Sequence, residues 1–126
     1  MRFMGIDYGS KRVGIALSDE SGNMAFPETV LINDDKLAKA IADIIETKQV
    51  TEIVIGHSLH TDGSENPLHT RVKEFITELT LAVGLPIHLE PEQYSTQEAI
   101  RFQGRTDKTD ASAAAIILNS FLNKRT

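Results

Sequence analysis

Near the start of the chain the sequence reads Phe3-Met-Gly-Ile-Asp7-Tyr-Gly9-Ser-Lys11-Arg12-Val13-Gly-Ile-Ala-Leu17-Ser-Asp19. Two short apolar runs, residues 3–6 and 13–17, are separated here by a polar turn that holds glycine, serine and two cations. Short apolar runs bounded by turn residues are typical of a β-hairpin. Residues 3–19 are therefore expected to form the first two strands of a sheet.

Asp7 directly follows the first apolar run, inside the expected strand, where a charge is costly to bury. A carboxylate in such a place is tolerated when it is paired, protonated or bound to a cation. Gly5, Gly9 and Gly14 remove side chains around it, so another group could approach the backbone closely. Asp7 could instead simply end the strand or begin the turn. Partners for Asp7 elsewhere in the chain would favour a functional role.

The composition is that of an ordinary globular chain. Of its 126 residues, 40% are hydrophobic and 25% are charged, and none is cysteine. No apolar run approaches the roughly 20 residues of a membrane span, and the first residues lack the apolar core of a signal peptide. A chain without cysteine forms no disulfide or thiolate metal site and fits a reducing cytoplasm. We expect one cytoplasmic domain, residues 1–126, that does not enter a membrane.

Charge is distributed unevenly along the chain. The formal net charge is −5 and the pI is about 5.3, whereas proteins that grip nucleic acid by bulk electrostatics are usually basic. Basic residues nevertheless gather in the first turn, at Lys11 and Arg12, and near the C-terminus, where Lys124 is one of them. This distribution allows a local basic rim on an acidic protein.

The rest of the chain alternates strand-like runs with helical patterns. Strand patterns follow at residues 26–32, 52–56 and 85–89, and helical patterns at residues 37–48, 67–83, 95–103 and 110–122. Residues 33–35 offer caps for the first helix and Thr109 for the last. Strand–helix–strand units require parallel strands, while the opening strands form an antiparallel meander. The sequence thus predicts an α/β fold, a five-stranded mixed sheet with helices on both faces.

Four carboxylates stand where these elements would meet. Asp7 lies in the first strand, Glu90 and Glu92 follow the last strand, and Asp110 opens the last helix. Because helical residues three and four apart share a face, Asp110 should point toward the sheet together with Ile117 and Phe121. A carboxylate at a helix start is also a common partner of the helix dipole.

Carboxylates that converge on one sheet edge are the ligands that hard divalent cations need. Mg²⁺ takes oxygen ligands and keeps several waters, so two or three carboxylates can suffice. Two such ions can flank a phosphodiester bond during hydrolysis. We therefore expect a site for Mg²⁺ or Mn²⁺.

Other polar residues carry weaker signals. The histidines match no usual zinc spacing and are expected to be structural or solvent-exposed: His57, His60, His69 and His88. Ser95 and Thr96 are most simply helix caps, although a helix N-terminus can also face a phosphate. No nucleophile triad, Walker loop or dinucleotide fingerprint is present.

Nearly the whole chain resembles the YqgF (RuvX) family, Holliday-junction resolvases of the ribonuclease-H-like fold that are also linked to processing of the 5′ end of pre-16S ribosomal RNA. The opening Gly5-Ile-Asp7-Tyr-Gly9-Ser-Lys11-Arg12-Val-Gly14 resembles its first-strand motif almost residue for residue. Residues 54–56, 62–65 and 71–72 resemble its central motif, and residues 109–118 resemble its final acidic helix.

The resemblance implies roles for particular residues. Asp7, Glu92 and Asp110 would take the catalytic, metal-binding positions. Nucleic-acid contacts without sequence preference would come from Lys11, Arg12 and Arg71. Independently of the resemblance, the predicted helix start at Ser95 and Thr96 is a further candidate for a phosphate contact. A resolvase that acts on a two-fold junction would also be expected to form a homodimer.

The chain departs from the family pattern in two places. Pro91 stands where the family has an acid and Gln93 where it has an arginine, and the central strand ends in His57-Ser58 in place of Leu-Pro. We expect the metal site to be retained while substrate contacts differ. Glu90 could replace Glu92 as a ligand if the strand register shifts by two residues, since the face is then unchanged.

These features favour a divalent-metal-dependent endonuclease that acts on structured RNA or branched DNA. One alternative is a non-catalytic RNA- or ribosome-associated module with a degenerate site, which Gln93, His57 and the negative charge suggest. Another is a phosphotransferase related to actin-like ATPases, whose phosphate loop also reads Asp-x-Gly. Those enzymes need two domains and an adenosine pocket, which 126 residues do not accommodate.

Overall fold

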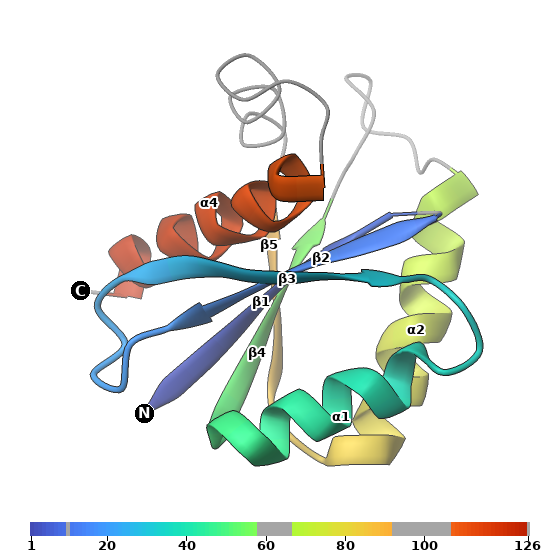
Figure 1. Cartoon of the computed structure of the whole chain (residues 1–126), viewed down its shortest axis with the longest axis horizontal. Helices are drawn as coiled ribbons and strands as arrows, with labels where there is room; N and C mark the ends of the chain where they lie inside the picture. The colour runs from blue at the N-terminus through green and yellow to red at the C-terminus, as the bar shows by residue number, and fades with distance from the viewer. Residues whose placement is uncertain (10, 58–66, 92–106, 126) are drawn as a thin grey trace.

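A five-stranded sheet with helices on both faces forms the centre of the computed structural model, which describes residues 1–9, 11–57, 67–91 and 107–125 (Figure 1). The strands are β1 (Arg2–Tyr8), β2 (Arg12–Ser18), β3 (Ala25–Ile32), β4 (Val50–His57) and β5 (Ile87–Pro91). The helices are α1 (Leu37–Lys48), α2 (Pro67–Val83) and α4 (Asp107–Arg125).

The strands lie in the order β3-β2-β1-β4-β5. β1 pairs antiparallel with β2, and β2 pairs antiparallel with β3. β1 pairs parallel with β4, and β4 pairs parallel with β5. The mixed sheet expected from the sequence is confirmed, and β1 is the strand at which its antiparallel and parallel parts join.

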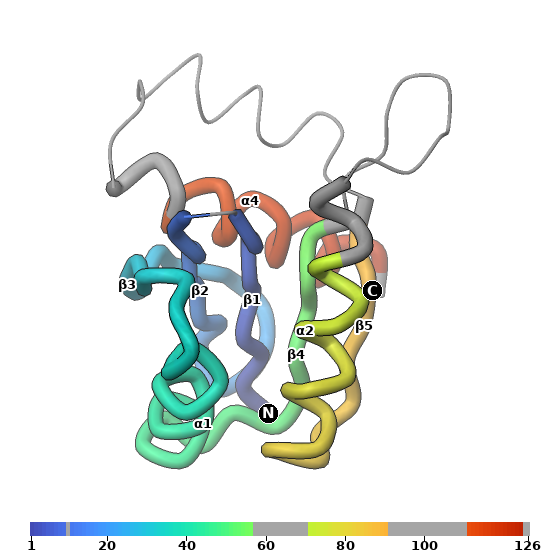
Figure 2. The backbone as a smooth tube through the Cα atoms, turned by 90° about the vertical axis from the view of Figure 1, so that its right-hand side faces the viewer, coloured from blue at the N-terminus to red at the C-terminus, as the bar shows by residue number. Residues whose placement is uncertain are grey.

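The two faces of the sheet are covered by different helices. Alternation along β1 directs Met4 and Ile6 to one face, where they pack with Ile41 of α1 and Leu79 of α2. Phe3 and its neighbours on the other face pack against α4 through Ala114, Ile117, Leu118 and Leu122. Figure 2 shows α4 crossing above the strands, on the side away from α1. The predicted sheet-facing stripe of the last helix is confirmed at Ile117 and Phe121, while the side chain of Asp110 lies outside the described residues.

α4 lies unusually close to the β1 backbone. A Cβ built at Gly5 would come 2.8 Å from the carbonyl oxygen of Ala114 and 2.8 Å from the Cβ of Leu118. Small residues in this part of α4, Ala111 and Ala113 among them, are buried and leave room for the approach. The absence of a side chain at Gly5 thus allows α4 to pack this close to the sheet.

Several predicted boundaries differ from the structure: β4 runs over Val50–His57 and not 52–56, and β5 and α4 begin at other residues than expected. The last strand runs from Ile87 to Pro91 and not over residues 85–89, because Gly84 with φ 66° ends α2 and the Pro86 carbonyl accepts a hydrogen bond from Ile53 before the ladder begins. Pro91 is tolerated there because β5 is an edge strand. α4 begins at Asp107, so Asp110 lies within its first turn and does not open it.

The connection from β3 to α1 also differs from expectation. Lys36 occupies the N-cap position of α1 without a side-chain cap. The Asp34 carboxylate accepts a hydrogen bond from the Lys36 N–H at 2.9 Å, which shapes the turn ahead of the helix. Asn33 turns away from α1, toward the β1–β2 turn. The helix expected at residues 95–103 lies outside the described residues.

None of the helices in the described part of the chain has the length and apolar character needed to cross a membrane.

Candidate active site

Asp7 lies at the edge of the sheet where β1, β4 and β5 end. In the paired strands Ile6 stands beside Ile55, and Gly56 stands beside Glu90, so Asp7 and Glu90 share one row across the sheet. Alternation places Asp7 on the same face as Gly5, under α4, and its side chain is half-buried. The carboxylate is therefore held at the rim of the core, within reach of solvent.

Asp110 reaches the same edge through the direction of α4. Phe3 stacks near Phe121, with ring centroids 6.0 Å apart, and Gly5 lies under Ala114, so α4 runs back along β1. Asp110 lies four residues before Ala114, about 6 Å along the axis. Asp7 lies two strand residues beyond Gly5, about 6.6 Å. The backbone thus carries both positions to one end of the sheet, although the side chain of Asp110 is outside what the structure describes.

Glu90 accepts hydrogen bonds from two side chains near the C-terminal end of α4. Its side chain is buried, and its Oε1 accepts hydrogen bonds from Ser120 Oγ at 3.0 Å and from Lys124 Nζ at 2.6 Å. The sequence analysis did not find this pair, because its members are 34 residues apart. A carboxylate paired with lysine is a poor candidate for a cation ligand, and Glu92, the other candidate, lies outside the described residues. The sequence analysis assigned Lys124 to a basic rim. In the structure its ammonium group pairs with Glu90 and so links α4 to β5.

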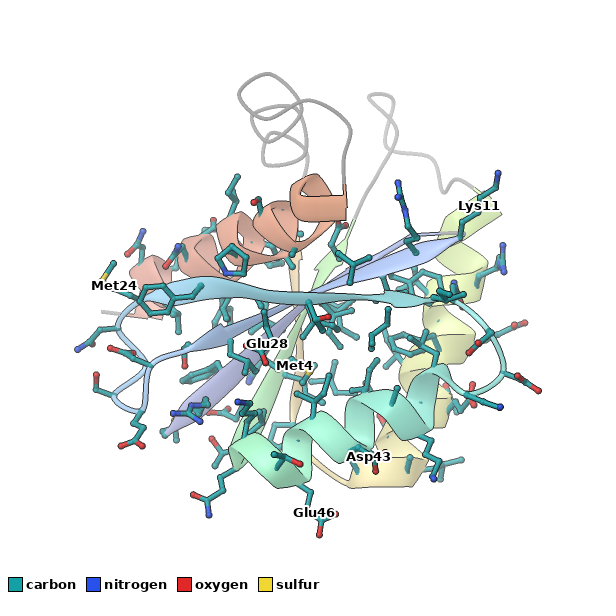
Figure 3. All side chains as sticks on the ribbon, in the orientation of Figure 1. Met4, Lys11, Met24, Glu28, Asp43 and Glu46 are labelled. Atoms are coloured by element: carbon teal, nitrogen blue, oxygen red, sulfur yellow. The ribbon has the colours of Figure 1, made fainter. Side chains whose placement is uncertain are left out.

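The β1–β2 turn presents Lys11 and Arg12 at the same end of the sheet. Both residues are exposed, and Figure 3 shows the Lys11 side chain projecting from the end of the hairpin, away from the body of the protein. Both residues follow Asp7 by way of the β1–β2 turn, so two exposed cations lie near that carboxylate in the chain.

Arg71 lies near this edge but across the sheet from α4. It lines a cleft of about 190 Å³ together with Tyr8, whose ring centroid is 4.8 Å from that of Phe75. Four carboxylates share the cleft: Asp34, Asp35, Glu74 and Glu78. Arg71 is thus less favourably placed for phosphate than Lys11 is. Glu92, Ser95 and Thr96 lie outside the described residues.

Comparison with known proteins identifies the family. Residues 1–124 match the model of the RuvX family, which is described as Holliday junction resolvase. The chain belongs to the RuvX family. A protein of Oleidesulfovibrio alaskensis is 33% identical over 133 residues, which cover 98% of this chain and 92% of that protein. One from Maridesulfovibrio salexigens is 36% identical over 132 residues, covering 97% and 98%. Both are provisionally named pre-16S rRNA nucleases.

Solved structures share the fold of this RuvX-family chain at low sequence identity. Thermus thermophilus RuvC in complex with a Holliday junction substrate superposes with a TM-score of 0.65 at 14% identity, covering 99% of this chain and 96% of that one. The fowlpox virus resolvase in complex with Holliday junction DNA gives a TM-score of 0.61 at 12% identity, covering 99% of each chain. The ribonuclease-H-like fold implied by the resemblance is confirmed.

This member of the RuvX family offers oxygen ligands of the kind that a hard divalent cation takes. Among the side chains that the structure describes, no three histidine, cysteine or acidic groups cluster as a metal site. Asp7 is described, whereas Glu92 and the side chain of Asp110 are not. The half-buried carboxylate of Asp7, at the same sheet edge as the start of α4, fits Mg²⁺ or Mn²⁺ better than a softer metal.

The side chain of His88 makes contacts within the fold, as the sequence analysis expected. Its Nε2 lies 2.9 Å from Glu52 Oε1, and its ring centroid lies 4.9 Å from that of Phe121. The side chains of the other histidines are outside the described part of the chain.

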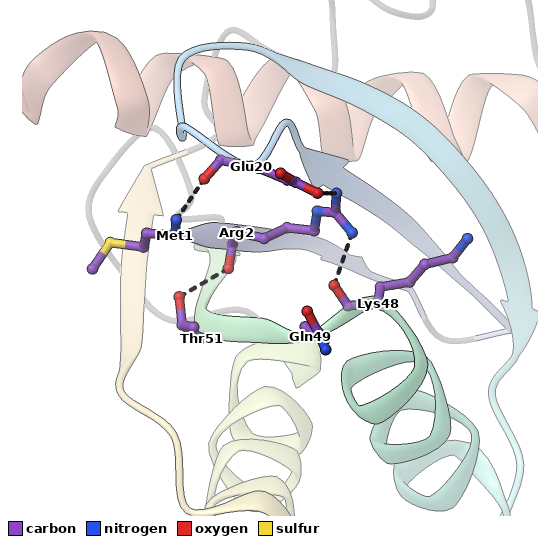
Figure 4. Close-up of a pocket in the computed structure, with 6 residues that line it drawn as sticks. All are labelled: Met1, Arg2, Glu20, Lys48, Gln49 and Thr51. Atoms are coloured by element: carbon purple, nitrogen blue, oxygen red, sulfur yellow. Dashed lines mark hydrogen bonds and ion pairs between the residues drawn. The ribbon is translucent and has the colours of Figure 1, made fainter.

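A second cleft lies at the opposite end of β1 (Figure 4). It has a volume of about 350 Å³, and its lining residues are Met1, Arg2, Glu20, Lys48, Gln49 and Thr51. The Arg2 guanidinium already donates to the Lys48 carbonyl at 2.8 Å and lies 3.6 Å from the Glu20 carboxylate. The cleft is separated from Asp7 by the length of the strand and forms no part of the candidate site.

Proposed function

We propose that this chain is a divalent-metal-dependent endonuclease that processes the 5′ end of pre-16S ribosomal RNA. The observation that carries the proposal is the placement of Asp7 and the first turn of α4 at one edge of the sheet, set by the contact between Gly5 and Ala114. The choice of RNA rests on relatives that are 33% and 36% identical over nearly their whole length and bear that name. Such a substrate implies a cytoplasmic location.

In this proposal Asp7, Glu92 and Asp110 hold Mg²⁺ or Mn²⁺. A bound ion would supply an activated water and stabilise the charge that develops on the phosphodiester. Lys11 and Arg12, with Ser95, Thr96 and Arg71, would hold the backbone phosphates in register with the carboxylates. These contacts carry no sequence information, so specificity would come from the shape of the folded RNA.

Resolution of Holliday junctions is the second candidate function. It is supported by the description of the family and by the shared fold of RuvC and the fowlpox virus resolvase. A four-way junction has two-fold symmetry, so this activity would require a homodimer with two sites.

The test is cleavage of two substrates by the purified chain with Mg²⁺ or Mn²⁺. One substrate is a transcript that spans the 5′ end of pre-16S rRNA, and the other is a synthetic four-way DNA junction. Cleavage of the transcript at a defined position, lost in Asp7→Asn, is the expected result. Cleavage of the junction alone would favour the second candidate. Tight RNA binding without cleavage would point to a non-catalytic module.

A further inference from the structure

Asn33 donates two hydrogen bonds to the β1–β2 turn. Its Nδ2 donates to the carbonyl of Gly9 at 2.7 Å, and its backbone N–H donates to the carbonyl of Lys11 at 2.9 Å. Asn33 directly follows the last ladder pair, Arg12 with Ile32, so the end of β3 extends across to the turn. The side-chain bond spans 24 residues in sequence and is partly buried.

Gly9 and Arg12 approach each other closely across the turn. A Cβ at Gly9 would lie 2.5 Å from the carbonyl oxygen of Arg12, so the two ends of the turn are in direct backbone contact. Gly9 supplies the close approach, but glycine also permits many backbone conformations when nothing restrains it. The amide of Asn33 restrains the Gly9 carbonyl through its hydrogen bond.

This restraint acts on the cations that the proposed function uses. Lys11 and Arg12 are long, exposed side chains, and ordering them on a ligand costs conformational entropy. A backbone held in place before binding lowers that cost. It also fixes the backbone positions of both residues relative to Asp7, which lies just before the turn in β1.

We propose that Asn33 is a positioning residue that holds the β1–β2 turn so that Lys11 and Arg12 meet the nucleic-acid backbone beside Asp7. The inference rests on the proposed function, because it concerns how the same site receives its substrate. Asn33 itself does not contact the substrate in this proposal; it acts through the turn.

The test compares Asn33→Leu with the wild-type chain. Leucine has nearly the shape of asparagine, and the variant keeps the backbone bond to Lys11, so the side-chain donor is the main loss. Binding is measured by fluorescence anisotropy on the four-way junction and the RNA transcript, with Ca²⁺ in place of Mg²⁺, at several salt concentrations. We expect binding to weaken about tenfold, because a small misplacement of contact groups is costly. The slope of log K against log[salt] should fall by roughly one to two, the share of one or two phosphate contacts.

Three further variants separate positioning from simple loss of structure. In a Lys11→Ala/Arg12→Ala background, Asn33→Leu should weaken binding less than about twofold, because non-additivity marks residues that act as a unit. Asn33→Ser, which keeps a donor on a shorter side chain, should fall between wild type and Asn33→Leu. Asn23→Leu is the matched control, since Asn23 Nδ2 bonds Ser21 Oγ in the turn at the other end of the hairpin, and it should bind as wild type.

Several outcomes would overturn the inference alone: wild-type binding by Asn33→Leu, the same loss in Asn23→Leu, or a tenfold loss that persists without Lys11 and Arg12. A wild-type chain that binds neither probe would overturn the proposed function, and this inference with it.

Discussion

Gly5 of β1 lies so close beneath Ala114 of α4 that a Cβ on the glycine would come 2.8 Å from the Ala114 carbonyl oxygen. This backbone-to-backbone contact determines where α4 sits along β1. Asp7 lies two strand residues after Gly5, and Asp110 lies about one helical turn before Ala114. Both steps lead toward the same end of the sheet. The candidate site therefore depends on a residue that has no side chain.

Gly5→Ala should disturb both folding and activity. The added methyl group must push α4 away from the sheet, which costs about 1–3 kcal/mol in the free energy of unfolding. A shift of α4 by about 1 Å would lower the cleavage rate by about a hundredfold. Denaturant unfolding and cleavage of the pre-16S rRNA transcript measure the two effects. Gly84→Ala is the control, because Gly84 has φ +66° with nothing within 4 Å. It should lose stability through backbone strain and keep its activity.

Glu90 and Glu92 should respond differently to the same isosteric change. Glu90→Gln keeps an acceptor for Ser120 and Lys124, so cleavage should stay within a few-fold of wild type. Glu92→Gln should lose cleavage, because a neutral amide is a poor ligand for a hard divalent cation. The measurement is the single-turnover rate of each variant at saturating Mg²⁺. Loss of cleavage in Glu90→Gln with retention in Glu92→Gln would reverse the assignment.

Lys124→Met should weaken the attachment of α4 to β5. The buried carboxylate of Glu90 would keep the Ser120 hydroxyl and lose its charged partner, which lies at 2.6 Å. Because Lys124 is 62% exposed, water can take over part of its role. We expect a loss of about 1–3 kcal/mol in the free energy of unfolding. Addition of Glu90→Gln to this variant should recover part of the loss, and a further loss would contradict the pairing.

Asp19 should make stability depend on pH in the acid range. Hydrogen bonds from the backbone N–H groups of Asn23 and Met24, with one from Ser21, lower the pKa of Asp19 below its ordinary value of 3.8. The unfolded state then binds more protons in this range, so stability rises with pH. The contribution is complete above the unfolded pKa and is lost as pH falls through the folded pKa. The stability difference between wild type and Asp19→Ala, measured by urea unfolding, should therefore shrink below about pH 4. A difference that grows on acidification would contradict the assignment.

Local pattern accounts for what the sequence predicted correctly. Ala114, Ile117 and Leu118 follow helical spacing, so the buried face of α4 could be read from their positions. The apolar runs around Asp7 and the turn between them predicted the first hairpin and placed the carboxylate at its end. Gly5 and Gly9 were expected to permit close approach, and each does so, one to α4 and the other to the backbone of Arg12.

The features that were missed are contacts between distant parts of the chain. Asn33 was interpreted as a helix cap because asparagine is common at that position. In the structure its amide donates a hydrogen bond to the carbonyl of Gly9, 24 residues away. Glu90 and Lys124 each looked like a solvent-exposed charge or a site residue, and only the packing of α4 on β5 shows that they form a pair. Charge and periodicity describe neighbours along the chain and carry no information about such partners.

The most direct test of the account is the cleavage rate of Asp7→Asn at saturating Mg²⁺, measured beside its thermal unfolding midpoint. If Asp7 holds the catalytic ion, the rate should fall by more than about a hundredfold, since even groups that only support a metal ligand are worth 10–100-fold. If Glu92 and Asp110 converge on Asp7 as proposed, the midpoint should stay at the wild-type value or rise, because one of the converging negative charges is removed. A folded Asp7→Asn variant that cleaves the transcript within a few-fold of the wild-type rate would contradict the account.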